Sequence, residues 1–272
     1  MVAHVLRLRL ALIGGAFRSS GRRAVGLVLA ALVAVCAVIA AGWALLSLAF
    51  AEANVAQAVI VLAGTAVTLA FAVTSLAAGT DDPLDPRRFA PMGLPLRPLT
   101  LALTLAAFIS VPAVMLALVS VCFVIAWAGH GVSPVVGVLA ALAGLVTSVL
   151  LAKICEALST LVLRQRRSRE LIGLFVVAIV VVVVPAGVFL ASLDWKGQVP
   201  AELDAAVNVL GFTPFGAAWA IPGQVAAQSA GVWGSVAVAA VTVAALGFGW
   251  RALVHRLLTT VERPDSGRSR SG

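Results

Sequence analysis

The feature that most constrains this chain is a succession of long apolar stretches without a charged residue. Residues 24–51 and 53–80 contain no Asp, Glu, Lys or Arg, and a helix needs about 20 apolar residues to cross the hydrocarbon core of a bilayer. Charged residues make up only 11% of the 272 residues, against about a quarter in soluble domains. We therefore expect an all-α integral membrane protein, with a single transmembrane domain over residues 1–272 and no separate soluble domain.

Six transmembrane helices account for the apolar stretches. They are expected at residues 24–51, 53–80, 98–128, 132–152, 171–193 and 231–250. The uncharged stretch 205–250 is too long for one straight span, and Pro214 and Pro222 interrupt its first half. Residues 205–228 are therefore predicted to form short outer re-entrant helices, which enter and leave the membrane on one side before the sixth span.

The basic residues indicate the orientation of the spans. All but one of the 19 Lys and Arg residues lie in segments that six spans place on one side, namely 1–23, 81–97, 153–170 and 251–272. Because short cytoplasmic segments are enriched in Lys and Arg, both termini are predicted to be cytoplasmic. Apolar and basic residues alternate at roughly helical spacing in 1–23, which predicts an amphipathic helix on the membrane surface. The polar end of the chain, 262–272, is predicted to be disordered.

The net charge of +8 does not indicate binding to nucleic acid. The basic residues lie at the ends of apolar stretches rather than on one polar face with exposed aromatic residues. That is the pattern of topology signals and lipid headgroup contacts. The three cysteines, Cys36, Cys122 and Cys155, have neither disulfide nor metal-ligand spacing. We therefore expect membrane lipid around the chain, and no metal site or cofactor within it.

The first predicted cytoplasmic loop, DDPLDPRRFAPMGLPLRP, has the sequence of a docking surface. Asp85 is a favourable helix N-cap, and Pro86 suits the first helical position. A short helix starting there would expose Arg87, Arg88 and Phe89 to a partner protein. The alternative interpretation is a structured loop whose arginines serve only as topology signals.

The same loop supports a second function class. Asp81, Asp82 and Asp85 match the D-D-x-x-D pattern of enzymes that bind a diphosphate through magnesium ions. Such enzymes use two acidic clusters, and the second cluster is missing here, while Pro83 interrupts the helix that would align the carboxylates. A magnesium-dependent membrane prenyl or lipid transferase is therefore the alternative function, and a non-catalytic membrane scaffold is the third.

Lys153 and Glu156 are the charged pair closest to a predicted span. Their spacing of three residues lets the two side chains pair on one helix. The fourth helix is expected to continue past both residues into the cytoplasm. Buried, the pair would indicate an ion path; at the end of a span, which we favour, it is an interfacial pair that extends towards the headgroups.

Four segments together resemble the ABC-2 type transporter permeases, in particular those of bacterial exporters. These are the amphipathic first helix, the loop LDPRRFAPMGLPLRP, the loop RQRRSRE and the segment TPFGAAWAIPGQVAAQ before the sixth span. The resemblance extends over essentially the whole chain. It implies a membrane subunit of an ATP-binding-cassette exporter in a bacterial plasma membrane. No G-x-x-x-x-G-K-[ST] loop is present in the sequence, so ATP and Mg²⁺ would bind a separate ATPase subunit and this chain would not be an enzyme.

The resemblance also assigns roles to particular segments. Residues 1–23 would be the connecting helix, and 81–98 the coupling loop that rests on the ATPase. Residues 205–228 would cap the translocation path. The residues of this outer gate segment are Pro214, Phe215, Trp219 and Pro222. Many permeases with this loop resemble two six-span halves in one chain, whereas this chain has one. It would therefore pair with a second six-span unit, as a homodimer or as a portion of a longer permease.

Single cysteines at Ser168 and Gly197 test the six-span topology. With the native cysteines removed, a membrane-impermeant thiol reagent added to intact cells should label Gly197→Cys and leave Ser168→Cys unlabelled. The reason is that six spans place the two positions on opposite sides of the membrane. Labelling is measured by mass shift, and permeabilised cells, where both should react, are the control. Labelling of Ser168→Cys in intact cells would contradict the six-span arrangement.

Overall fold

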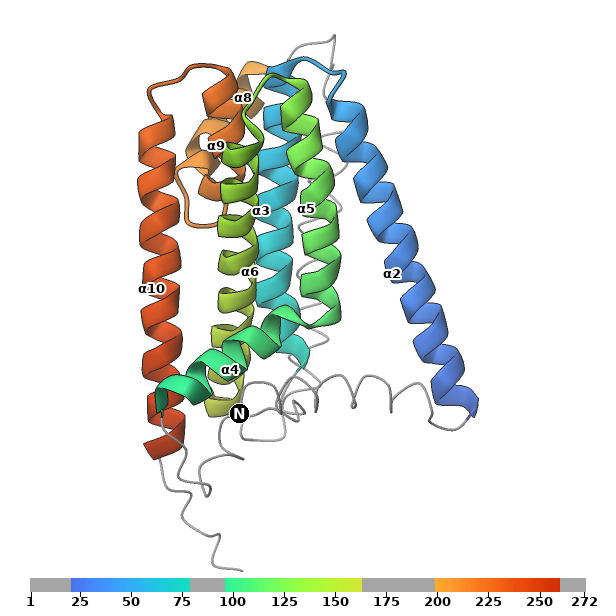
Figure 1. Cartoon of the computed structure of the whole chain (residues 1–272), viewed down its shortest axis with the longest axis vertical. Helices are drawn as coiled ribbons and strands as arrows, with labels where there is room; N and C mark the ends of the chain where they lie inside the picture. The colour runs from blue at the N-terminus through green and yellow to red at the C-terminus, as the bar shows by residue number, and fades with distance from the viewer. Residues whose placement is uncertain (1–20, 79–95, 163–198, 260–272) are drawn as a thin grey trace, which may run out of the picture.

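A computed structural model describes residues 21–78, 96–162 and 199–259 (Figure 1). Within these ranges the chain is entirely helical, with eight helices and no strand. The helices are α2 (Gly21–Leu48), α3 (Ala53–Ala78), α4 (Leu96–Phe108), α5 (Val111–Gly129), α6 (Pro134–Val162), α8 (Ala201–Gly211), α9 (Ala217–Ala226) and α10 (Val232–Thr259).

Five of these helices, α2, α3, α5, α6 and α10, are long and apolar enough to cross a membrane. Each overlaps one of the six stretches expected from the sequence. The fifth expected span, 171–193, lies outside the described residues, as do most of the amphipathic segment 1–23 and the whole tail 262–272. The chain is thus a multi-pass membrane protein that is all-α over the residues described.

The expected third span, 98–128, is wrong in its extent. The structure divides it into α4 and α5, with a break at Ile109 and Ser110. Ser110 has an extended backbone (φ −72°, ψ 147°), and a proline occupies the first turn of α5. Because Pro112 has no amide hydrogen, it cannot donate the helical hydrogen bond to Phe108. Only α5 is long enough to span, and α4 takes a different direction.

The long helices lie side by side and define two ends of the bundle (Figure 1). One end, here called the α9 end, holds α8, α9 and the turns between α2 and α3, between α5 and α6, and between α9 and α10. At the opposite end, the α4 end, α4 lies across the bundle and α10 finishes. The last turns of α10 expose Arg251 and Arg256 there. A tight turn at Gly131, which has a φ of +77°, joins α5 to α6.

The segment before α10 forms the two short helices expected from its proline and glycine content. At 1.5 Å per residue, α8 and α9 are each about 15 Å long, half the thickness of a hydrocarbon core. Their boundaries differ from the prediction, because α8 begins at Ala201 rather than at 205. The predicted segment begins after Asp204 because Glu202 and Asp204 are charged, but acidic side chains favour the first turn of a helix.

Pro222 was expected to interrupt this segment, and that expectation is wrong. Pro222 lies inside α9, where it removes a single backbone hydrogen bond, the one to Ala218. Every residue from Ala217 to Gln224 is buried, so packing against the bundle holds the helix together despite the missing bond.

α4 is fastened to the bundle by a small buried cluster. Side chains of α4, α6 and α10 make up this cluster, which contains Ala102, Leu103, Ala106, Leu150, Ala157, Trp250, Val254 and Leu257. The indole Nε1 of Trp250 donates a hydrogen bond to Thr104 Oγ1 at 3.0 Å. α4 therefore connects mechanically to α6 and α10.

Two tryptophans of α10 provide a matched test of this attachment. Trp250 is 4% exposed, whereas Trp233 is 77% exposed. Trp250→Ala should lower the free energy of unfolding by about 3 kcal/mol, as cavity-forming aromatic deletions do. Trp233→Ala should leave it unchanged. Thermal unfolding of the purified protein in detergent measures both, and equal effects of the two substitutions would contradict the attachment of α4 through Trp250.

Candidate functional site

The side chain of Trp219 extends from the short helix α9 into the centre of the bundle. Its side chain is 5% exposed and lies between Gly64 of α3 and Gly144 of α6. A Cβ atom at Gly144 would come within 2.7 Å of Trp219 Cζ2, and one at Gly64 would overlap the indole ring. Only glycine leaves room for the indole at these two positions, which together form a socket for Trp219.

A hydrogen-bond network fixes the indole in this socket. Trp219 Nε1 donates to Thr68 Oγ1 at 3.1 Å. Thr68 Oγ1 in turn lies 3.3 Å from Ser148 Oγ, and each hydroxyl donates to a carbonyl of its own helix, at 2.9 Å in both cases. All three polar side chains are buried. Water is absent from a bilayer core, so breaking the bond from Trp219 to Thr68 would leave both polar groups without a partner, which is unfavourable.

Two further contacts fix the position of α9 and its neighbours. Phe123 of α5 packs edge to face against Trp219, with the ring centroids 5.6 Å apart. The hydroxyl of Ser235, at the start of α10, donates to the carbonyl of Gly211 at the end of α8, at 2.8 Å. The first contact thereby joins α9 to α5, and the second joins α8 to α10 at the α9 end.

Only two of the four residues predicted for the outer gate segment are buried. The structure buries Trp219 and Pro222, leaves Phe215 half-buried, and exposes Pro214. Of these residues, Trp219 contacts Gly64 of α3 and Gly144 of α6. Trp219 was predicted from the sequence, whereas the two glycines and two hydroxyls around it were not. Their four-residue spacing, Gly64 to Thr68 and Gly144 to Ser148, is the small-residue pattern typical of close helix contacts in membranes, and could have indicated them.

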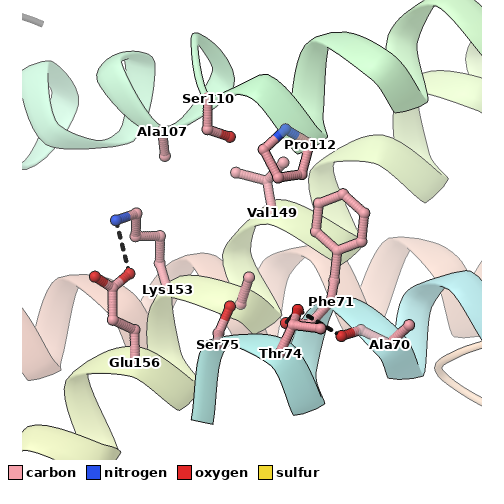
Figure 2. A pocket seen from close by; sticks show the side chains of 11 residues that line it. Ala70, Phe71, Thr74, Ser75, Ala107, Ser110, Pro112, Val149, Lys153 and Glu156 are labelled. Atoms are coloured by element: carbon pink, nitrogen blue, oxygen red, sulfur yellow. Dashed lines mark hydrogen bonds and ion pairs between the residues drawn. The ribbon is translucent and has the colours of Figure 1, made fainter. Parts of the chain in front are cut away.

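A second polar feature lies towards the α4 end. There α3, α6 and the junction of α4 with α5 line an open cavity of about 500 Å³. Figure 2 shows Lys153 and Glu156 at one end of this cavity, Phe71 and Pro112 at the other, and Val149 between them. The hydroxyl-bearing residues Thr74, Ser75 and Ser110 also line it.

The charged pair at this cavity confirms the pairing expected from the sequence. Lys153 Nζ lies 2.8 Å from Glu156 Oε2, and the two side chains are 17% and 22% exposed. α6 continues to Val162, as expected. At 1.5 Å per residue, Lys153 lies about 29 Å along the helix from Pro134. The pair therefore lies in the last third of the apolar stretch Pro134–Ser159 of α6.

The other predicted site residues lie outside the described residues. These are the coupling-loop residues Asp85, Pro86, Arg87, Arg88 and Phe89, and the carboxylates Asp81 and Asp82 of the alternative magnesium site. In the part of the chain that the structure describes, no group of His, Cys, Asp and Glu side chains is arranged to hold a metal ion.

Comparison of the chain with protein-family models, with curated proteins and with solved structures found no match. The fold and the two polar features therefore define the class of protein by themselves. It is a multi-pass helical membrane protein in which a short helix is locked into one end of the bundle and a cavity with a charged pair opens near the other.

Gly64→Ala tests the Trp219 socket. The added methyl group would overlap the indole, so the free energy of unfolding should fall by about 1–3 kcal/mol, as in overpacked cores. Gly247→Ala is the matched control, because a Cβ there meets no atom within 4 Å. Replacing Trp219 by Leu in the Gly64→Ala background should remove most of the penalty, measured as coupling in a double-mutant cycle. Additive effects of the two substitutions would contradict the socket.

Proposed function

We propose that this chain is the membrane-spanning permease of an ATP-binding-cassette exporter, driven by a separate ATPase subunit that binds ATP and Mg²⁺. The observation that carries the proposal is the position of α8 and α9. They lie at the end of the bundle opposite the arginines of α10 and directly precede the last span. This is the place that the resemblance to ABC-2 permeases assigns to the short helices capping the translocation path.

The positions at which α6 ends and α8 packs support a topology of six spans with cytoplasmic termini. α6 finishes at the α4 end, where Ala157 joins the cluster with α4, whereas α8 packs on the start of α3 through Leu203 and Val207. The chain between α6 and α8 must therefore link opposite ends of the bundle, and 171–193 is apolar enough to do so through the membrane. Positive-inside bias then favours a cytoplasmic α4 end.

α4 connects the proposed coupling loop to the membrane-spanning helices. It begins at Leu96, within the expected coupling loop 81–98, and its far end joins the break before α5. Between these points Thr104 accepts the hydrogen bond from Trp250 of α10, and Ala106 belongs to the cluster shared with α6. A displacement of the loop by an ATPase would act on three spans through one rigid helix.

Substitutions in the loop test the proposal. Phe89→Ala, or Arg87→Glu together with Arg88→Glu, should weaken association with the ATPase about tenfold, since aromatic and arginine anchors dominate docking surfaces. Expression and topology should be unchanged. Co-purification of the ATPase and transport-coupled ATP hydrolysis are the measurements. Lys196→Glu, a charge reversal predicted to lie on the opposite side of the membrane, is the control and should have no effect.

The same assay distinguishes the transferase. In that case Asp81→Asn and Asp82→Asn would abolish an activity that depends on Mg²⁺ and a prenyl diphosphate, and Phe89→Ala would have little effect. Wild-type ATPase binding and transport in all of these loop variants would refute the coupling role.

A further inference from the structure

A groove of about 770 Å³ runs between α6 and α10, and side chains of α9 also line it. On α6 its lining extends from Val136 to Val146, and on α10 from Val232 to Ala244. The groove therefore starts in the first turns of both helices, at the α9 end (Figure 1). Among the described residues that line it, the indole nitrogen of Trp233 is the one polar side-chain atom. A ligand in this groove would be held by apolar contacts.

The groove has a floor of small side chains and rims of large ones. Ala140 of α6 and Ala239 of α10 line it and are buried, so they form the floor. Leu139, Leu142 and Trp233 also line it but are exposed, so they form the rims. Exposed apolar side chains on membrane-spanning helices are as apolar as the lipid tails around them. The open side of the groove is therefore accessible from the hydrocarbon of the bilayer.

The depth of the groove matches one leaflet of a bilayer. At 1.5 Å per residue, its lining is about 15 Å long on α6 and about 18 Å long on α10, which is about half of a hydrocarbon core about 30 Å thick. Beyond this depth the two helices approach each other. Val146 and Leu246 pack against the buried cluster that fastens α4, and a Cβ atom at Gly249 would lie 3.7 Å from Ile154 Cδ1. The groove is therefore closed at its inner end.

This depth decides between the two apolar occupants that a membrane offers, a helix and an acyl chain. A membrane-spanning helix is about 30 Å long, so it would meet the groove over only about half of its length. An acyl chain from the leaflet at the α9 end has the matching length. An extended chain advances about 1.2 Å per bond, as the polypeptide backbone does, so the groove accommodates about 12–15 carbons of such a chain.

Packing is the force that would favour a chain in the groove over the same chain in the surrounding lipid, because both environments are apolar. The floor and the two rims contact the chain on three sides, and these dispersion contacts are lost when the groove is unfilled. Water cannot replace them, since a bound water molecule needs two to four polar partners. At the α9 end, the exposed indole of Trp233 can donate a hydrogen bond to the lipid head, as interfacial tryptophans do.

We propose that this groove binds one acyl chain of a membrane lipid from the leaflet at the α9 end. The lipid head lies beside Trp233, and the end of the chain lies near Val146 and Ala244. The bound chain contacts α6, α9 and α10 together, so the lipid is a structural ligand of the end of the bundle that holds α9. The inference concerns this chain alone and is independent of transport and of an ATPase.

Photolabelling of the purified chain in phosphatidylcholine vesicles tests the inference. The probe is a phosphatidylcholine with a diazirine at about the twelfth carbon of one chain, the depth at which the groove ends. After irradiation, peptide mass spectrometry should find labels at Ala143 and Val146, which line the inner part of the groove and are half-buried. Leu118 and Val121 of α5 are exposed and report contact with bulk lipid in the same sample. Labels on α5 without labels at Ala143 and Val146, as a second copy seated in the groove would give, overturn the proposal.

Two alanines of α10 provide matched variants. Ala240 and Ala245 are both exposed, but only Ala240 lines the groove. Ala240→Phe should fill the groove and lower labelling at Ala143 about tenfold relative to α5, because the ring occupies the volume of the chain. Ala245→Phe should leave this ratio unchanged. If Ala240→Phe fails to fold, Val236→Phe, which narrows the groove nearer to the α9 end, serves instead. An unchanged ratio in the folded groove variant, or an equal loss in Ala245→Phe, overturns the proposal.

Discussion

The insertion of Trp219 between α3 and α6 is the interaction on which the arrangement of the bundle depends. Helices in a bilayer gain no hydrophobic free energy by leaving lipid, so close packing and hydrogen bonds must hold them together. Gly64 and Gly144 permit the close approach, and the bond from the indole to Thr68 adds specificity of position. α9 thereby becomes a fixed part of the core of the bundle, although it is too short to cross the membrane.

The second constraint is the break before Pro112. Had the helix continued straight, α4 would extend the span of α5 instead of lying across the α4 end. Ala107, Ser110 and Pro112, at and beside this break, line the cavity that Lys153 also lines. On the other side of the break, Thr104 of α4 accepts the hydrogen bond from Trp250. The cavity and the connection between the loop and the last span therefore lie on either side of one break.

The sequence predicts the number and place of the described spans well, because a crossing helix needs an uncharged segment of a definite length and hydropathy measures that directly. The missed features depend on shape instead. No charged residue interrupts 98–129, so Pro112 is the residue that could have indicated the break. The first short helix was predicted to begin after the charged residue Asp204, whereas α8 begins at Ala201. Gly64 and Gly144 resemble any other glycines of a span until Trp219 is placed between them.

The socket and the cavity lie on the same two helices, and this shared position links the two ends of the molecule. On α6, Ser148 belongs to the Trp219 network and Val149, the next residue, lines the cavity. On α3, Thr68 and Phe71 are separated by less than one turn and play the corresponding parts. Any movement of α9 that withdrew Trp219 would let α3 and α6 approach each other at the socket. The cavity, about one turn away along both helices, would change shape with them, because packed helices move as rigid units rather than deforming gradually.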